Sequence, residues 1–452
     1  MPALRLSLCL IARDEALLLP GCLRSAGPEV DELIVLDTGS VDPTPALAAA
    51  AGAAVHHFRW VDDFSAARNA ALAHATGDWV VVLDADERLL PGAGDRLRAA
   101  IEARGPDAVL LPWLNANSVD APLDAVVDGR CRLGEVAYVP RLFRREPALR
   151  WEGVVHELPA SWLAAPGRRV ISVDEPIIHL GNAPDWRAAR QKDARNRRLL
   201  ELQAASSPLN PSAWASLATE RLKAGDAAGG RQAAARAFVI LRQRMQGPAP
   251  RPAPVPVVTV AAFCAVSGGH PAEARAILAE SAPWCGPHPN LALLEAVALD
   301  AILDAGGTIE PRAVDAALHG LEAARAAAGR PFVEELLPGA TSTQAWRFEG
   351  ELRLARGEHE AALAAFQRAG PGPEAALGTA RALLGAGLLA RAASQLEALV
   401  RAGSGDARVV LAALLAQLGD RDAAARLLRA PGPPPTRVAL RRQAEALRGP
   451  YG

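Results

Sequence analysis

Two carboxylates two residues apart, Asp84 and Asp86, offer the most evident chemistry in this chain of 452 residues. They directly follow the apolar run Trp79–Leu83. Side chains two residues apart lie on the same side of an extended chain. Mg²⁺ and Mn²⁺ are hard cations, which proteins bind through a few carboxylates together with substrate phosphates. The spacing therefore favours a divalent cation that bridges a diphosphate and neutralises its departing charge. The alternative is a solvated turn or a helix N-cap leading into Arg88–Leu90.

The elements around this pair alternate between strand and helix. Apolar runs predict four strands: Leu6–Ala12, Asp31–Leu36, Ala53–Phe58 and Trp79–Leu83. Between them we expect three helices: Asp14–Ser25, Pro43–Gly52 and Ser65–Ala75, the last with Ser65 as its N-cap. This order predicts βαβ units and a mainly parallel, Rossmann-like sheet, in which ligands bind beyond the carboxyl ends of the strands. Arg13, Asp37 and Asp84–Asp86 would then share one rim.

Shorter strand-like segments follow, at Ala108–Trp113, Glu135–Phe143 and Val170–Ile178, and we assign them to the same domain. From Trp186 onward nearly every segment reads as helix. A set of six residues there has the tetratricopeptide spacing: Trp346, Gly350, Gly357, Ala362, Phe366 and Ala369. The frame recurs around Gly387 and Gly419 and, in degenerate form, around Gly225; generic helical hairpins are the alternative. We predict an α/β domain over residues 1–205 and an all-α, tetratricopeptide-like domain over residues 206–452.

Composition narrows the functional classes. The net charge of −1 gives no sign of nucleic-acid binding. The five cysteines are scattered and form no CxxC motif, which favours reduced thiols in a cytoplasmic protein. We find neither a signal-like segment at the N-terminus nor an apolar run of about 18 residues, so we expect no membrane span.

Five motifs occur in a recognisable order: Leu8–Glu15, Asp37–Thr44, Asp62–Asn69, Gly77–Trp79 and Asp84–Glu87. This series resembles the large GT-A family of inverting glycosyltransferases, family 2. It is especially similar to the bacterial branch that carries tetratricopeptide repeats at its C-terminus and includes enzymes that glycosylate peptides. The resemblance is close over about residues 4–200. One departure is Asp14, where the family more often has asparagine.

The resemblance implies a binding site for a nucleotide sugar. Ala12, Arg13, Glu15 and Asp37 would bind the nucleoside, and a carboxylate such as Asp37 can accept hydrogen bonds from a base or a ribose. Arginine is a bidentate partner for phosphate oxygens. Asp42 is better explained as a cap of the next helix, and Arg68 has the alternative of a surface ion pair with Asp62 or Asp63. The residues expected near the diphosphate are Arg68, Asn69, Asp84 and Ala85.

Residues further along the chain would complete the catalytic machinery. Inverting transfer needs one base to deprotonate the acceptor, and the resemblance points to Glu157, with its neighbour His156 as a substitute. His179 matches the C-terminal histidine that many GT-A enzymes place on the metal, so Asp84, Asp86 and His179 would hold Mn²⁺ or Mg²⁺. The alternative for His179 is a histidine hydrogen-bonded within the sheet. Trp151 could line the acceptor groove or belong to the core.

We therefore expect a metal-dependent hexosyltransferase that moves a sugar from a nucleotide sugar, UDP being the expected nucleotide, to a polypeptide. Stacked helical repeats form concave surfaces that suit peptides. Two alternatives remain. One is a lipid-linked or small-molecule glycan acceptor, with the repeats serving oligomerisation, for instance in a homodimer. The other is a non-catalytic scaffold on a transferase fold. The basic stretch Lys192–Arg197 is better explained as a seam between the domains than as a diphosphate ligand.

Overall fold

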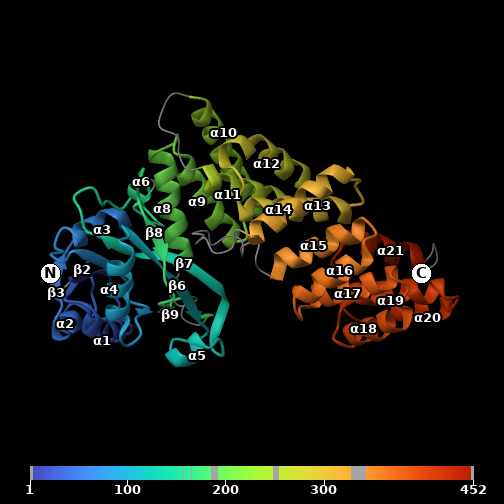
Figure 1. Ribbon diagram of the computed structural model, residues 1–452, viewed down its shortest axis with the longest axis horizontal. Helices are drawn as coiled ribbons and strands as arrows, with labels where there is room; N and C mark the ends of the chain where they lie inside the picture. Colours follow the sequence, from blue (N-terminus) through green and yellow to red (C-terminus); the bar gives the residue numbers. More distant parts are fainter. Residues whose placement is uncertain are drawn as a thin grey trace. The chain divides into compact units, whose positions relative to one another are not determined.

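The computed structural model describes residues 4–155, 157–163, 165–184, 192–247, 254–326 and 343–448. These described residues form two compact units, one up to Gly225 and one from Asp226 onward. Figure 1 shows the first as strands and helices in blue to green, and the second as helices alone in green to red. The domain boundary between residues 205 and 206 stays a prediction.

A single sheet organises the first unit. Among the described residues it has nine strands, and all but β8 follow the order β3-β2-β1-β4-β7-β6-β9-β5. The neighbours from β3 to β4 are parallel, whereas β7 runs antiparallel to both β4 and β6. The strands are β1 (Leu6–Ala12), β2 (Glu32–Asp37), β3 (Ala54–His57), β4 (Trp79–Val82), β5 (Glu87–Arg88), β6 (Ala108–Ala116), β7 (Arg132–Arg144), β8 (Val170–Ser172) and β9 (Ile177–His179).

Both faces of this sheet are buried, as a mainly parallel sheet requires. Along β1, Leu8 belongs to the core on one face and the adjacent Cys9 to the core on the other. The first core contains side chains of α1 and α4, and the second contains side chains of α3. The helices are α1 (Leu19–Ala26), α2 (Thr44–Ala50), α3 (Phe64–Leu72), α4 (Ala93–Arg104), α5 (Leu123–Val127), α6 (Ala160–Leu163), α8 (Lys192–Ser206) and α9 (Pro211–Lys223).

Three local predictions need correction. The first helix begins at Leu19 rather than at Asp14, because Asp14 has a positive φ of 54° that a helix does not allow. The N-cap of α3 is Asp63, whose carboxylate accepts a hydrogen bond from the Ala66 amide, and not Ser65. The single strand predicted over Val170–Ile178 is two separate strands, β8 and β9.

The second unit consists of helical hairpins, as the repeat spacing predicts. Within one hairpin, a Cβ atom at Gly350 would lie 2.7 Å from the Phe366 ring, so only glycine lets α15 approach α16 this closely. The helices are α10 (Ala227–Gln246), α11 (Pro254–Ser267), α12 (Pro271–Cys285), α13 (Pro289–Asp304), α14 (Pro311–Ala326), α15 (Thr343–Ala355), α16 (His359–Arg368), α17 (Pro373–Gly385), α18 (Leu389–Arg401), α19 (Gly405–Gln417), α20 (Arg421–Arg429) and α21 (Val438–Arg448).

Two further expectations concern thiols and membranes. The cysteines form no disulfide in the structure, and burial raises the pKa of Cys9 and of Cys264 to about 12. Such thiols stay protonated and unreactive at neutral pH, which agrees with a structural role. In the part of the chain that the structure describes, no helix combines the length and apolar character needed to cross a bilayer.

Candidate active site

A cluster of alternating charges lies just beyond the end of β4. The carboxylate of Asp84 accepts a hydrogen bond from Arg68 Nη2 at 2.6 Å and another from Arg141 Nη2 at 3.1 Å. Arg68 comes from α3, and its Nε donates to Glu157 Oε1 at 2.8 Å. Arg68 is 7% exposed and Glu157 is 10% exposed, so this arginine is a buried link between two predicted site residues and not a surface ion pair with Asp62 or Asp63.

Glu87 anchors the other side of the cluster and is fully buried. Its Oε1 accepts hydrogen bonds from Arg141 Nη2 at 2.6 Å and from Trp113 Nε1 at 2.7 Å, and its Oε2 accepts one from the Asp84 amide at 2.9 Å. The side chain therefore ties together β6, β7 and the segment after β4. A buried carboxylate with three donors is well satisfied and holds its partners in place.

The charges in this cluster perturb one another. Burial opposes the charged form of Asp84, but the guanidinium groups of Arg68 and Arg141 outweigh it and lower the pKa of Asp84 to about 2. Burial also opposes the charged form of Arg68, yet the carboxylates of Asp84 and Glu157 raise its pKa. Burial raises the pKa of Glu87 despite the nearby Arg141. Asp84 and Arg68 are therefore ionised at neutral pH.

This arrangement predicts how acid affects the fold. Because the folded pKa of Asp84 lies below its ordinary value of 3.8, its contribution to stability is complete above that value. The contribution is lost as the pH falls from 3.8 towards about 2. We expect the difference in urea midpoint between the wild type and Asp84→Asn to stay constant above pH 3.8. The difference should decrease only between pH 3.8 and about pH 2. A relative midpoint that already declined near neutral pH would contradict the ion-pair geometry.

A second pair of predicted ligands, Asp86 and His179, lies in contact on the β5–β9 side of the site. His179 Nε2 is 3.7 Å from Asp86 Oδ1, and their side chains are 8% and 6% exposed. The strand register explains the approach, because Glu87 of β5 pairs with His179 of β9. Glycine at position 181 is also required, since a Cβ atom there would lie 2.1 Å from Asp86 Oδ2.

The donor set decides which metal this site fits. Within the described ranges, no group of three or more His, Cys, Asp or Glu side chains is already assembled around a common point. Of the three predicted ligands, Asp84 is bound to two arginines, whereas Asp86 and His179 face each other. Two protein ligands fit Mg²⁺ or Mn²⁺ that takes its remaining ligands from water and substrate phosphates. They do not fit a closed structural zinc site, which needs four.

Gly181→Ala tests this geometry. The added methyl group would also lie 2.8 Å from His179 Nε2, so Asp86 or His179 has to move. We expect Mn²⁺ binding, measured by electron paramagnetic resonance, to weaken about tenfold or more. Gly27→Ala is the matched control, because a Cβ atom there would meet only Leu33 at an ordinary 3.8 Å. Unchanged Mn²⁺ affinity in Gly181→Ala would remove Asp86 and His179 from the metal site.

The residues predicted to bind the nucleoside lie at the carboxyl ends of β1 and β2. Ala12 and Asp37 are register partners in these two strands, so the topology brings them together. Asp37 is buried, accepts from the Ser40 amide at 3.2 Å, and lies 3.4 Å from His57 Nδ1. The backbone N–H of Glu15 donates to Thr44 Oγ1 at 2.7 Å. Arg13 points partly into solvent, 3.9 Å from Asp14.

Several other predicted residues have structural partners. The amide of Asn69 is paired with the backbone of Trp151 in both directions, at 3.0 and 2.9 Å. Trp151 is 5% exposed and packs edge-on against Phe143, so it is a core residue and not a lining of the acceptor groove. Asp42 accepts from the amides of Thr44 at 2.9 Å and Ala16 at 3.1 Å, but the N-cap of α2 is Pro43, so the expected capping by Asp42 is wrong and Asp42 holds the loop before the helix. Ala85 is buried in the sheet core. His156 lies outside the described residues.

Three residues that support the site were not predicted from the sequence: Glu87, Trp113 and Arg141. Arg141 lies within the predicted strand Glu135–Phe143, and Glu87 is the last residue of the motif Asp84–Glu87, and neither position by itself indicates a role in the site. Trp113 had no signal beyond its place in a strand. Its role depends on two contacts that folding creates: the hydrogen bond to Glu87, and stacking on the His179 ring with centroids 4.2 Å apart. Trp113 pairs with Ile177 in the β6–β9 register, and no local pattern reveals that register.

Comparison with known proteins finds a family match in the N-terminal part of the chain. Residues 7–129 match the family described as glycosyl transferase family 2. A TPR repeat-containing protein of Synechococcus elongatus is 43% identical over 212 residues, which cover 45% of this chain and 49% of that protein. The SPbeta prophage-derived glycosyltransferase SunS of Bacillus subtilis is 25% identical over 208 residues, covering 45% and 46% respectively. The chain thus spans about half the length of the curated relatives it matches.

Among solved structures, glucosyl-3-phosphoglycerate synthase from Mycobacterium tuberculosis, in complex with Mn²⁺, UDP-glucose and phosphoglyceric acid, is 30% identical in the aligned part. That alignment covers 24% of this chain and 44% of the synthase, with a TM-score of 0.22.

Proposed function

We propose that this chain, whose N-terminal domain belongs to glycosyl transferase family 2 and is followed by tetratricopeptide-like repeats, transfers a sugar from a UDP-sugar to a polypeptide with inversion. The observation that carries the proposal is the joint placement of two groups. The buried pair Asp86–His179 offers ligands for a cation, and the adjacent cluster of Arg68, Asp84 and Glu157 offers charges for a diphosphate and an acceptor.

The charge balance of the site supports the proposal of a divalent cation. Three carboxyl groups (Asp84, Glu87 and Glu157) pair with two guanidinium groups (Arg68 and Arg141), and a fourth carboxyl group, that of Asp86, lies beside His179. An anionic diphosphate would be repelled by this excess of carboxylates unless a cation entered with it. Asp86 and His179 would hold Mn²⁺ or Mg²⁺ there, and the ion would stabilise the charge of the departing nucleoside diphosphate.

The chain's own residues supply the rest of the chemistry. In an inverting displacement, the bond from the anomeric carbon to the new acceptor atom forms while the bond to the diphosphate oxygen breaks. The acceptor loses its proton to a base, for which we propose Glu157. Arg68 links Glu157 to Asp84 at 2.8 and 2.6 Å and so fixes the base relative to the diphosphate end of the site.

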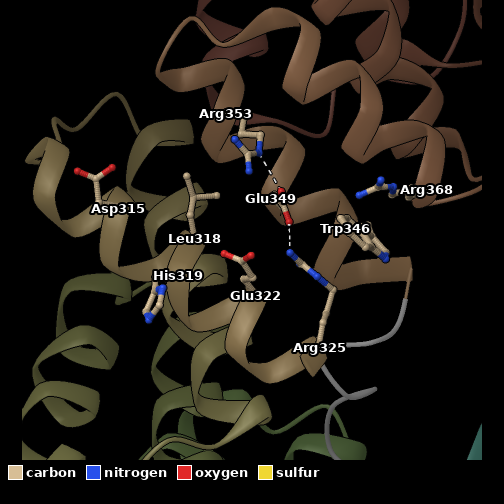
Figure 2. Close-up of a pocket in the computed structure, with 9 residues that line it drawn as sticks. All are labelled: Asp315, Leu318, His319, Glu322, Arg325, Trp346, Glu349, Arg353 and Arg368. Carbon is tan, nitrogen blue, oxygen red and sulfur yellow. Dashed lines mark hydrogen bonds and ion pairs between the residues drawn. The ribbon is translucent and has the colours of Figure 1, made fainter. Parts of the chain in front are cut away.

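For the polypeptide we propose a pocket of the second unit as a docking point. Figure 2 shows Trp346 and Glu349 on α15, opposite side chains of α14. The pocket has a volume of about 660 Å³. The guanidinium groups of Arg325 and Arg368 lie 3.9 and 4.8 Å from the centre of the Trp346 ring, and Glu349 pairs with Arg325 at 2.7 Å. An aromatic surface beside hydrogen-bonding charges suits peptide side chains and backbone.

Donor chemistry is tested with the full chain. We expect slow release of UDP from a UDP-sugar when Mn²⁺ is present, and loss of this release after chelation. A panel of UDP-glucose, UDP-galactose and UDP-N-acetylglucosamine identifies the sugar. Equal release without any divalent cation would overturn the metal assignment. Absence of both binding and release for every donor would favour a non-catalytic scaffold.

Acceptor chemistry is tested separately, with a library of synthetic peptides and mass spectrometry of the products. We expect Arg368→Glu to raise the KM for glycosylated peptides about tenfold and to leave UDP release unchanged, because Arg368 is exposed and lies in the second unit. Arg391→Glu, on a helix that does not line the pocket, is the control. Transfer to lipid-linked or free glycans but to no peptide would favour the alternative acceptor.

A further inference from the structure

The side chain of Asn115, which Asn182 contacts in turn, lies at the Nδ1 edge of the His179 ring, whereas Asp86 lies at its Nε2 edge. His179 Nδ1 lies 2.8 Å from Asn115 Oδ1, and Asn182 Nδ2 donates to the same oxygen at 2.9 Å. Asn115 and His179 are register partners in β6 and β9, so the sheet itself brings the amide to the imidazole. Neither asparagine belongs to the cluster around Asp84.

The oxygen Asn115 Oδ1, which both His179 and Asn182 contact, determines which ring nitrogen of His179 carries a proton. A carbonyl oxygen only accepts, so the hydrogen between Asn115 and His179 is on Nδ1. The second bond, from Asn182, holds the Asn115 amide with its oxygen toward the ring. In the neutral ring, His179 Nε2 then carries the lone pair, and this atom faces the carboxylate of Asp86 at 3.7 Å. Two buried electron-rich atoms in this relation favour a cation between them.

The ring is also held on its flat side. Trp113 stacks on His179 with ring centroids 4.2 Å apart and planes 29° from parallel. Trp113 is itself fixed by the hydrogen bond from its Nε1 to the fully buried Glu87. The imidazole therefore has one edge bound by Asn115 and one face covered by Trp113, and only its Nε2 edge faces Asp86.

We propose that Asn115 is a positioning residue that holds His179 in the Nδ1–H tautomer and thereby presents the Nε2 lone pair to a divalent cation shared with Asp86. This inference rests on the proposed metal-dependent function. It adds a residue that acts through His179, since Asn115 Oδ1 is engaged with His179 and Asn182. Outer partners of this kind orient a ligand histidine, and their loss weakens metal binding about 10- to 100-fold in known sites.

The first test is made on metal-free protein labelled with ¹⁵N-histidine. The chain has nine histidines, and His179→Gln identifies the signals of His179 by their disappearance. We expect nitrogen chemical shifts of a neutral ring protonated at Nδ1 in the wild type and in Asn115→Asp, which keeps an acceptor oxygen. In Asn115→Leu, which has no acceptor, the two tautomers should mix. An Nε2–H tautomer in the wild type would overturn the proposal, whether or not the protein binds a metal.

The second test measures Mn²⁺ affinity by electron paramagnetic resonance. We expect about 10- to 100-fold weaker binding in Asn115→Leu and near wild-type binding in Asn115→Asp. Asn117→Leu is the matched control, because Asn117 is an exposed neighbour and should bind Mn²⁺ normally. Equal affinity of Asn115→Leu and wild type would contradict the positioning role. If the wild type binds no Mn²⁺, the proposed metal dependence fails, and the tautomer measurement still decides the role of Asn115.

Discussion

Asp86→Asn is expected to lower the rate of UDP release about 1,000-fold, which corresponds to about 4 kcal/mol of transition-state stabilisation. The substitution keeps the size of the side chain but removes the negative charge that faces His179 at 3.7 Å in a nearly dry environment. Of the proposed ligands Asp86 and His179, only Asp86 is negatively charged, so the cation would bind more weakly. The negative charge of the departing diphosphate would then be left without a counter-charge. The measurement is steady-state UDP release at saturating donor, combined with Mn²⁺ titration.

The control for this prediction is Asp95→Asn. The side chain of Asp95 is 95% exposed in the first turn of α4, so the same chemical change there should leave UDP release unaltered. If Asp86→Asn lost Mn²⁺ affinity but kept the wild-type rate, the cation would be structural and not catalytic. If Asp86→Asn kept both the Mn²⁺ affinity and the rate, Asp84 and Asp86 would belong to a solvated turn without a metal, which is the alternative stated from the sequence.

The strands around the site could be predicted because each strand is marked by a short run of apolar residues that are consecutive in sequence. The predicted strand Leu6–Ala12 coincides with β1, and the strand before Asp84 ends one residue earlier than expected. Burial on both faces makes these strands continuous apolar runs, which are visible in one dimension. The rule that ligands gather beyond the carboxyl ends of parallel strands then places Asp37 and Asp84 at the same edge of the sheet.

The contacts inside the site could not be predicted in the same way. Arg68 and Glu157 are 89 positions apart in sequence, yet Arg68 Nε lies 2.8 Å from the Glu157 carboxylate. From the sequence, Asp62 and Asp63 were the candidate ion-pair partners of Arg68, because a motif contains only residues that are close in sequence. In the structure, the carboxylate of Asp63 caps α3, and Arg68 pairs with Asp84 and Glu157 instead. The Asn115–His179 contact depends in the same way on the register of β6 and β9.

Glu157→Gln is expected to lower the rate of sugar transfer to an acceptor by about 100-fold or more, with little change in UDP affinity. Glutamine matches glutamate in size but cannot take up the acceptor proton, and a positioned base is worth about 10²–10⁴ in rate. Single-turnover transfer isolates this step, and calorimetry with UDP and Mn²⁺ measures the donor side. Acceptor-independent UDP release should fall less than transfer, because water is available as an alternative nucleophile.

The contact with Arg68 creates a competing explanation, which a second variant separates from the first. Arg68→Lys keeps the positive charge but loses the hydrogen bonds to both Asp84 and Glu157. If Glu157 serves only to hold Arg68, this variant should show the same defect as Glu157→Gln. If Glu157 is the base, Arg68→Lys should instead weaken UDP binding and slow transfer and UDP release by similar factors. A catalytic base can be recognised by a third variant. Glu157→Asp should transfer sugar faster than Glu157→Gln, because the shorter carboxylate can still accept a proton and glutamine cannot. Matching losses in Glu157→Gln and Arg68→Lys, without recovery in Glu157→Asp, would assign Glu157 to the anchoring of Arg68 and leave the base to be found among its neighbours.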